Sequence, residues 1–132
     1  MKKVLILMAT YNGAKYLDEQ IQSLIEQKNV QVDILVRDDG STDNTIEVLN
    51  KWKEQNKLEW YKGKHLNVQF GFYDLMERAR TRDVDYLAFC DQDDVWDLDK
   101  LCIAVEKLEK LCNKSMPALY YCGQRLVDEN MK

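Results

Sequence analysis

The sequence predicts an α/β fold built on a mostly parallel sheet with helices on both faces. Short apolar runs rich in β-branched residues alternate with longer segments whose apolar residues recur at helical spacing. Alternation of this kind favours right-handed crossovers between parallel strands. The 132 residues contain no internal repeat, low-complexity tract or linker, so we expect residues 1–132 to form a single domain.

Five apolar runs are predicted to be strands, and a sixth is expected to begin near residues 125–127. The first run is apolar throughout, which is typical of a strand buried on both faces. The five predicted strands cover residues 3–8, 32–36, 58–61, 85–90 and 118–122.

Four helices are predicted between these strands. The first covers residues 14–27, and Ser41, Thr42 or Asp43 could cap the second. Residues 63–71 are polar and are expected to be irregular, and Met116-Pro117 is expected to end the last helix. The apolar stripes of the four helices are Leu17, Ile21, Leu24 and Ile25; Ile46, Leu49 and Trp52; Phe72, Leu75, Met76 and Ala79; and Leu101, Val105, Leu108 and Cys112.

The composition excludes several classes of function. The net charge is −4 with both signs interleaved, and no basic stripe is present, which argues against nucleic-acid binding. The negative net charge implies that an anionic ligand would bind together with a cation. The cysteines Cys90, Cys102, Cys112 and Cys122 form no CxxC pair and share the chain with a single histidine. A zinc site is therefore not expected. We expect the cysteines to be free thiols in a reducing cytosol.

Three polar clusters follow predicted strands. They cover residues 10–13, 38–43 and 91–94. Ligands of open parallel sheets bind beyond the carboxyl ends of the strands. We therefore expect all three clusters to face the same edge of the sheet and to converge on one site.

The third cluster predicts a divalent metal. Asp91, Asp93 and Asp94 would repel one another without a partner. Hard oxygen ligands favour Mg²⁺ or Mn²⁺, which proteins hold with one or two carboxylates while substrate phosphates complete the shell. We prefer Asp91 and Asp93 as metal ligands over a solvated, helix-capping loop, and we expect a bound diphosphate.

The first two clusters are candidates for base recognition. Tyr11 offers a face for stacking, Thr10 can hydrogen-bond a base edge, and Gly13 would permit a tight turn. Asp38 and Asp39 should point in opposite directions if they are extended, so that one bonds the neighbouring loop and the other faces the ligand. The alternatives are packing of Tyr11 under the loop and a simple Asx turn.

Together the segments 9–13, 38–43 and 91–96 resemble the family 2 glycosyltransferases, which have the GT-A fold. Order and spacing fit across nearly the whole chain. The resemblance implies a nucleotide-binding site made of Thr10, Tyr11, Asn12, Asp38, Asp39 and Asp91. Asp39 would hydrogen-bond the base and Asp38 would brace the loop. Asp91 and Asp93 would bind Mn²⁺ or Mg²⁺, with Asp93 ranking ahead as a direct ligand.

The resemblance also implies an activity. Family members transfer a sugar with inversion from a nucleotide diphosphate-sugar, here a UDP- or dTDP-sugar, to a glycan or lipid-linked acceptor in polysaccharide biosynthesis. The expected setting is the cytoplasm, with peripheral association at the inner face of the membrane. The acceptor pocket and catalytic base normally lie in a second half, so we expect this chain to be truncated before it and assign no base here.

Three other interpretations stay open at this point. A non-catalytic nucleotide-sugar-binding module would share the same site. A nucleotidyltransferase would also use carboxylates and metal, but residues 10–13 lack the basic glycine-rich loop typical of that class. A signalling receiver domain would carry its acids after the first and third strands, whereas here they follow the second and fourth.

Overall fold

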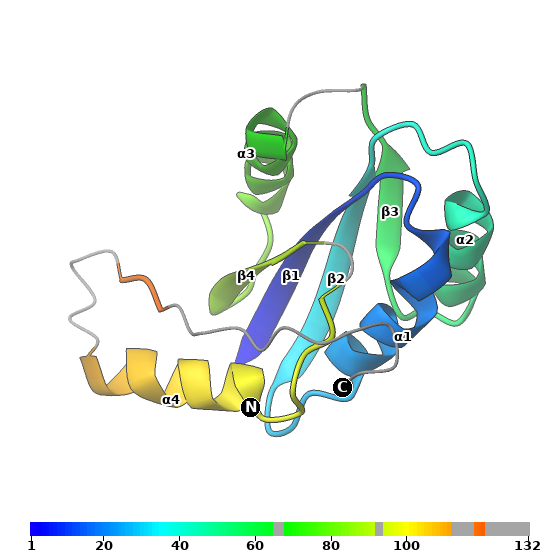
Figure 1. The fold of residues 1–132 in the computed structure, drawn as a ribbon. Helices are drawn as coiled ribbons and strands as arrows, with labels where there is room; N and C mark the ends of the chain where they lie inside the picture. Colours follow the sequence, from blue (N-terminus) through cyan, green and yellow to red (C-terminus); the bar gives the residue numbers. More distant parts are fainter. Residues whose placement is uncertain (65–67, 92–93, 112–117, 121–132) are drawn as a thin grey trace.

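The computed structural model describes residues 1–64, 68–91, 94–111 and 118–120. Strands and helices alternate along these residues, as the sequence predicts (Figure 1). The elements in chain order are β1 (Lys3–Thr10), α1 (Ala14–Ile25), β2 (Gln31–Asp38), α2 (Thr45–Glu54), β3 (Glu59–Lys62), α3 (Val68–Ala79), β4 (Tyr86–Asp91) and α4 (Lys100–Leu111).

The four described strands form one parallel sheet in the order β3-β2-β1-β4. The central strand β1 is the most deeply buried, because both of its neighbours are strands and both of its faces are covered. Val4, Leu5, Ile6, Leu7 and Met8 are each at most 2% exposed. The prediction of a strand buried on both faces is confirmed.

Each face of the sheet packs against different helices. Alternate residues of a strand point to opposite faces. Ile6 and Val36 face the larger core, which α1, α2 and α4 complete with Ile21, Leu49 and Leu101. The smaller core on the other face joins Leu5, Leu7 and Leu35 to Leu75 and Ala79 of α3. Figure 1 shows α3 across the sheet from α1 and α2, so the prediction of helices on both faces is confirmed.

Two predictions about local structure were wrong. Residues 63–71 were expected to be irregular, but α3 begins at Val68, because Phe72, Leu75 and Ala79 pack against the small core and hold the helix on the sheet. Residues 118–120, the described part of the predicted fifth strand, are not paired with the sheet. The rest of that strand, the break at residues 116–117 and the sixth strand lie outside the described residues. No described helix has the length and apolar character needed to cross a membrane.

Candidate functional site

The polar clusters meet at the carboxyl edge of the sheet. Thr10 at the end of β1 is the register partner of Asp38 at the end of β2. On the other side of β1, Ala9 is the partner of Asp91, the last residue of β4. Three segments that are far apart in the sequence therefore end side by side, as their positions after the strands predict. Asp93 lies outside the described residues.

Asp38 holds the loop after β2 in place. Its side chain is fully buried and its two oxygens accept four hydrogen bonds. Oδ1 accepts from the hydroxyls of Thr10 at 2.8 Å and Ser41 at 2.6 Å, and Oδ2 accepts from the backbone N–H groups of Gly40 and Ser41. A buried carboxylate is stable when donors of this kind replace water. Through these contacts Asp38 stabilises the loop after β2, which is the role that the resemblance implies for it.

Asn12 joins the first loop to the second. Its Oδ1 accepts from the backbone N–H of Thr42 at 2.8 Å, and its own N–H donates to Ser41 Oγ at 2.9 Å. The left-handed residue of the turn is Asn12, with φ of +47°, whereas Gly13 has φ of −108°. The turn therefore places its strain on Asn12, a residue that tolerates this conformation, and not on Gly13 as the sequence suggested.

Asp43 links the starts of two helices. Its Oδ1 accepts from the backbone N–H of Thr45, the first residue of α2, and its Oδ2 accepts from Ala14, the first residue of α1. Carboxylates stabilise helix N-termini in this position. Asn44 occupies the N-cap position of α2 and makes no capping bond with its side chain, so Asp43 does the capping from one residue earlier. The Thr45 hydroxyl in turn accepts from the N–H of Gly13 at 3.0 Å.

Asp39 faces the opposite side of the strand and pairs with a buried arginine. Arg37 lies two residues earlier, on the same face, and its guanidinium is bonded to Asp39 through Nη1. Its Nε donates to Asp74 of α3 at 3.2 Å, and its Nη2 donates to the carbonyl of Lys64 at 2.6 Å. A Cβ at Gly63 would collide with the Arg37 guanidinium, so a larger residue there would displace this side chain from its position.

The charges around Arg37 support one another. Burial disfavours the Arg37 cation, but Asp39 and Asp74 outweigh it and raise its pKa. Tyr61 donates its hydroxyl to Asp74 at 2.6 Å, and this bond, joined by Arg37 and Arg78, lowers the pKa of Asp74 despite some burial. Burial and the neighbouring carboxylate raise the pKa of Tyr61, which keeps it a neutral donor. The Arg78 guanidinium lies 3.7 Å from the centre of the Tyr61 ring.

The end of β4 offers a different kind of carboxylate. Asp91 is exposed, and within the described ranges its side chain has no hydrogen-bond or ion-pair partner. The preceding Cys90 is a buried free thiol, and burial raises its pKa to about 12. Cys102 is also free, while Cys112 and Cys122 lie outside the part of the chain described. An exposed carboxylate beside a ligand edge has the donor chemistry that Mg²⁺ or Mn²⁺ requires.

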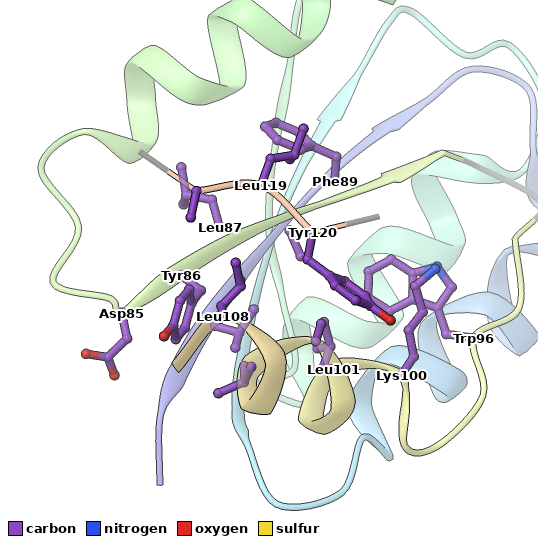
Figure 2. A pocket seen from close by; sticks show the side chains of 15 residues that line it. Asp85, Tyr86, Leu87, Phe89, Trp96, Lys100, Leu101, Leu108, Leu119 and Tyr120 are labelled. Carbon is purple, nitrogen blue, oxygen red and sulfur yellow. The ribbon is translucent and has the colours of Figure 1, made fainter. Parts of the chain in front are cut away.

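A cavity of about 650 Å³ lies elsewhere, between β4, α4 and residues 118–120. Figure 2 shows Tyr86 and Leu87 of β4 and Leu101 and Leu108 of α4 among its lining residues, with Leu119 beside β4. Its lining is mainly apolar and includes no residue of the three polar clusters. This cavity is therefore distinct from the candidate site at the carboxyl edge.

Sequence reasoning found Thr10, Asn12, Asp38, Asp39 and Asp91 at this edge, and Tyr11 lies beside them with 44% of its surface exposed. It missed Arg37, which is bonded to Asp39, and the residues that surround Arg37 beyond it, namely Asp74 with its partners Tyr61 and Arg78. The available signal was an arginine at the end of an apolar strand, because a charge in such a place needs a carboxylate partner.

A parallel α/β sheet whose carboxyl edge gathers acidic loops is the architecture of the GT-A glycosyltransferases. Two solved structures share it. *Staphylococcus aureus* TarS residues 1–349, solved with UDP-GlcNAc, is 26% identical with a TM-score of 0.63, over 83% of this chain and 32% of that one. The mannosyltransferase PcManGT of *Pyrobaculum calidifontis*, solved with GDP-Man and Mn²⁺, is 24% identical with a TM-score of 0.67, over 80% and 32%, and adds support for the fold alone.

The family follows from the sequence match. The model of glycosyl transferase family 2 matches residues 5–129, and the chain belongs to this family. The dTDP-rhamnosyl transferase RfbG of *Shigella flexneri* is 36% identical over 137 residues, which cover 92% of this chain and 45% of that protein. The putative teichuronic acid biosynthesis glycosyltransferase TuaG of *Bacillus subtilis* is 28% identical, over 83% and 43%. The chain thus spans less than half the length of these curated relatives.

Proposed function

We propose that this chain is the donor-binding half of a glycosyltransferase that uses a UDP- or dTDP-sugar. The observation that carries the proposal is the convergence of Asp39 and Asp91 on one sheet edge, on either side of the end of β1. One carboxylate is fixed by the chain's own donors and the other is exposed. A nucleotide diphosphate presents a base with N–H donors at one end and cation-seeking phosphates at the other, which matches this pair.

Base recognition is assigned to the interlocked loops after β1 and β2. Tyr11 lies at the rim of these loops with an exposed ring on which a base can stack. Asp39 is held by Arg37 and would accept a hydrogen bond from the base N–H. Thr10 is buried and its hydroxyl is committed to Asp38, so its contribution is to hold the loop beneath the base.

Metal binding is assigned to the end of β4. The described residues hold no group of three or more potential ligand side chains, so a closed protein cage is not the model for this site. Asp91 and Asp93 fit the other mode, in which one or two carboxylates share Mg²⁺ or Mn²⁺ with substrate phosphates. When bound, the cation supplies Lewis-acid stabilisation of the leaving diphosphate.

The rest of the reaction is assigned to a second half. The named relatives are more than twice as long as the matched segment, which supports an acceptor pocket and catalytic base elsewhere in the working protein. We propose inverting transfer to a glycan or lipid-linked acceptor in polysaccharide biosynthesis, carried out in the cytoplasm at the inner face of the membrane. Turnover by the longest natural form separates this proposal from a non-catalytic nucleotide-sugar-binding module.

Calorimetric titration of the chain with UDP, dTDP, ADP and GDP, with and without Mn²⁺, tests the assignment. Asp39→Ala is expected to weaken UDP and dTDP binding even without metal, because it removes the base acceptor. Asp91→Asn and Asp93→Asn are expected to remove only the part of the affinity that depends on Mn²⁺. Equal weakening of all four nucleotides by Asp39→Ala would contradict base recognition, and an affinity of the unmodified chain that is the same with and without Mn²⁺ would contradict the metal site.

A further inference from the structure

A buried polar stripe on α1 faces the segment that follows β4. Gln20, Ser23 and Gln27 recur at helical spacing beside the apolar stripe of α1, so they lie on one side of the helix and its end. They are 0%, 7% and 6% exposed. Glutamine is seldom buried without a purpose, because its amide must find partners to replace water.

Gln20 holds the end of β4. Its side-chain amide nitrogen donates to the backbone carbonyl of Asp91 and to Cys90 Sγ, the latter at 3.1 Å. The carbonyl belongs to the same residue whose carboxylate we assign to the metal. A bond at this atom restricts the backbone from which the Asp91 carboxylate projects.

Ser23 and Gln27 hold the chain beyond. Ser23 Oγ accepts from the backbone N–H of Trp96 at 3.1 Å and donates to the carbonyl of Gln20 at 2.7 Å. Gln27 Nε2 donates to the carbonyl of Asp97 at 2.7 Å, and its Oε1 accepts from the N–H of Leu101 at 2.9 Å. Helix α1 is thus bonded both to the end of β4 and to the backbone of Trp96, Asp97 and Leu101.

We propose that Gln20, supported by Ser23 and Gln27, is a positioning residue for the metal-binding carboxylate of Asp91. The inference rests on the proposed function of that carboxylate. All of these contacts to the segment are made to its backbone or to the Cys90 sulfur, so they fix its course without neutralising a carboxylate. A metal ligand held by a neutral outer partner keeps its full charge for the cation, and its geometry is set before the cation arrives.

The test compares two glutamines on one helix. Gln20→Met keeps the side-chain length and removes the amide, while Gln22→Met makes the same change at an exposed site whose side-chain amide donates to the Glu26 carboxylate. Mn²⁺ binding in the presence of UDP is measured by electron paramagnetic resonance of the free ion. We expect Gln20→Met to weaken it by about 10-fold to 100-fold. UDP binding in EDTA should be unchanged, and Gln22→Met should match the unmodified chain in both measurements.

The outcomes separate the inference from the proposed function. Failure of the unmodified chain to bind UDP or dTDP contradicts the function itself. If the unmodified chain binds UDP and Mn²⁺ and the folded Gln20→Met variant binds Mn²⁺ equally well, the positioning role of Gln20 is overturned while the proposed function stands. If Gln20→Met does not fold, Ser23→Ala replaces it, since it removes the acceptor for Trp96 N–H together with the hydroxyl's bond to the Gln20 carbonyl. A smaller loss of Mn²⁺ affinity in Ser23→Ala than the one expected for Gln20→Met supports the proposal, and an unchanged Mn²⁺ affinity in Ser23→Ala overturns it.

Discussion

The two acidic segments at the carboxyl edge differ in whether the chain itself supplies partners for their carboxylates. After β2, Asp38 is buried under four donors and Asp39 is paired with Arg37. At the end of β4, the Asp91 carboxylate is exposed and its backbone, not its side chain, is held by Gln20. In the first segment the carboxylates are bonded to donors of the chain itself. In the second segment the chain bonds the backbone of Asp91 and leaves its carboxylate exposed.

The difference separates two kinds of recognition. A carboxylate whose position is set by the chain's own cation can accept a hydrogen bond from a neutral donor with little reorganisation. A carboxylate that projects into solvent from a fixed backbone suits a cation taken from solution. In the proposed function, Asp39 would serve the base end of the sugar nucleotide and Asp91 its phosphate end, although the two acidic segments look alike in sequence.

The largest effect is expected from breaking the charge network at its centre. The Arg37 side chain is only 3% exposed and pairs with both Asp39 and Asp74. Arg37→Met removes this shared cation and leaves the two carboxylates without it. Removal of one partner from a buried pair typically costs about 3 kcal/mol or more. Urea unfolding should show this loss, and nucleotide binding should weaken with or without Mn²⁺.

Arg78→Met is the matched control for that variant. Arg78 also approaches Asp74, at 3.7 Å, but its side chain is 55% exposed. Exposed pairs contribute about 0–1 kcal/mol. Equal losses from the two variants would show that the network is a surface feature and would remove the contrast between the segments.

A smaller effect is expected when the two acids are compared directly. Asp38→Asn replaces one acceptor oxygen with a donor that faces donors, so it should cost about 2 kcal/mol in urea unfolding, in the range for hydrogen bonds to charged groups. Asp91→Asn changes an exposed side chain and should stay within about 0.5 kcal/mol of the unmodified chain. A large loss from Asp91→Asn would mean that its carboxylate is structural.

Periodicity and strand order explain why much of this edge could be predicted from sequence. The apolar run of β1 and the stripe of α1 each depend on neighbours a few residues away, and parallel strands bring their carboxyl ends together whatever the side chains are. The convergence of residues 10–13 with 38–43, and the opposite directions of Asp38 and Asp39, follow from these two rules.

The supporting networks could not be predicted in the same way. Gln20 contacts residues 70 and 71 positions away, and Arg37 reaches Asp74 across 37. Such bonds exist only once the helices have docked. The start of α3 was missed because Gln69 and Gly71 weaken the local helical pattern, while packing at Leu75 decides the outcome.

The smallest effect tests whether the two regions respond differently to acid. Tyr61→Phe removes the hydroxyl that donates to Asp74 and should cost about 0.5–1 kcal/mol at pH 7. Because that bond lowers the pKa of Asp74, its contribution is present above the ordinary carboxyl pKa of 3.8 and is lost as the pH falls through the lower folded value. The gap between Tyr61→Phe and the unmodified chain should therefore begin to narrow only below about pH 4 and should be much smaller at about pH 2. Ser23→Ala removes a neutral acceptor from the β4 side, so its loss should be the same at pH 7 and at about pH 2. Urea unfolding at both pH values gives the comparison, and a Ser23→Ala loss that also closes in acid would show that the β4 segment depends on charge as much as its neighbour does.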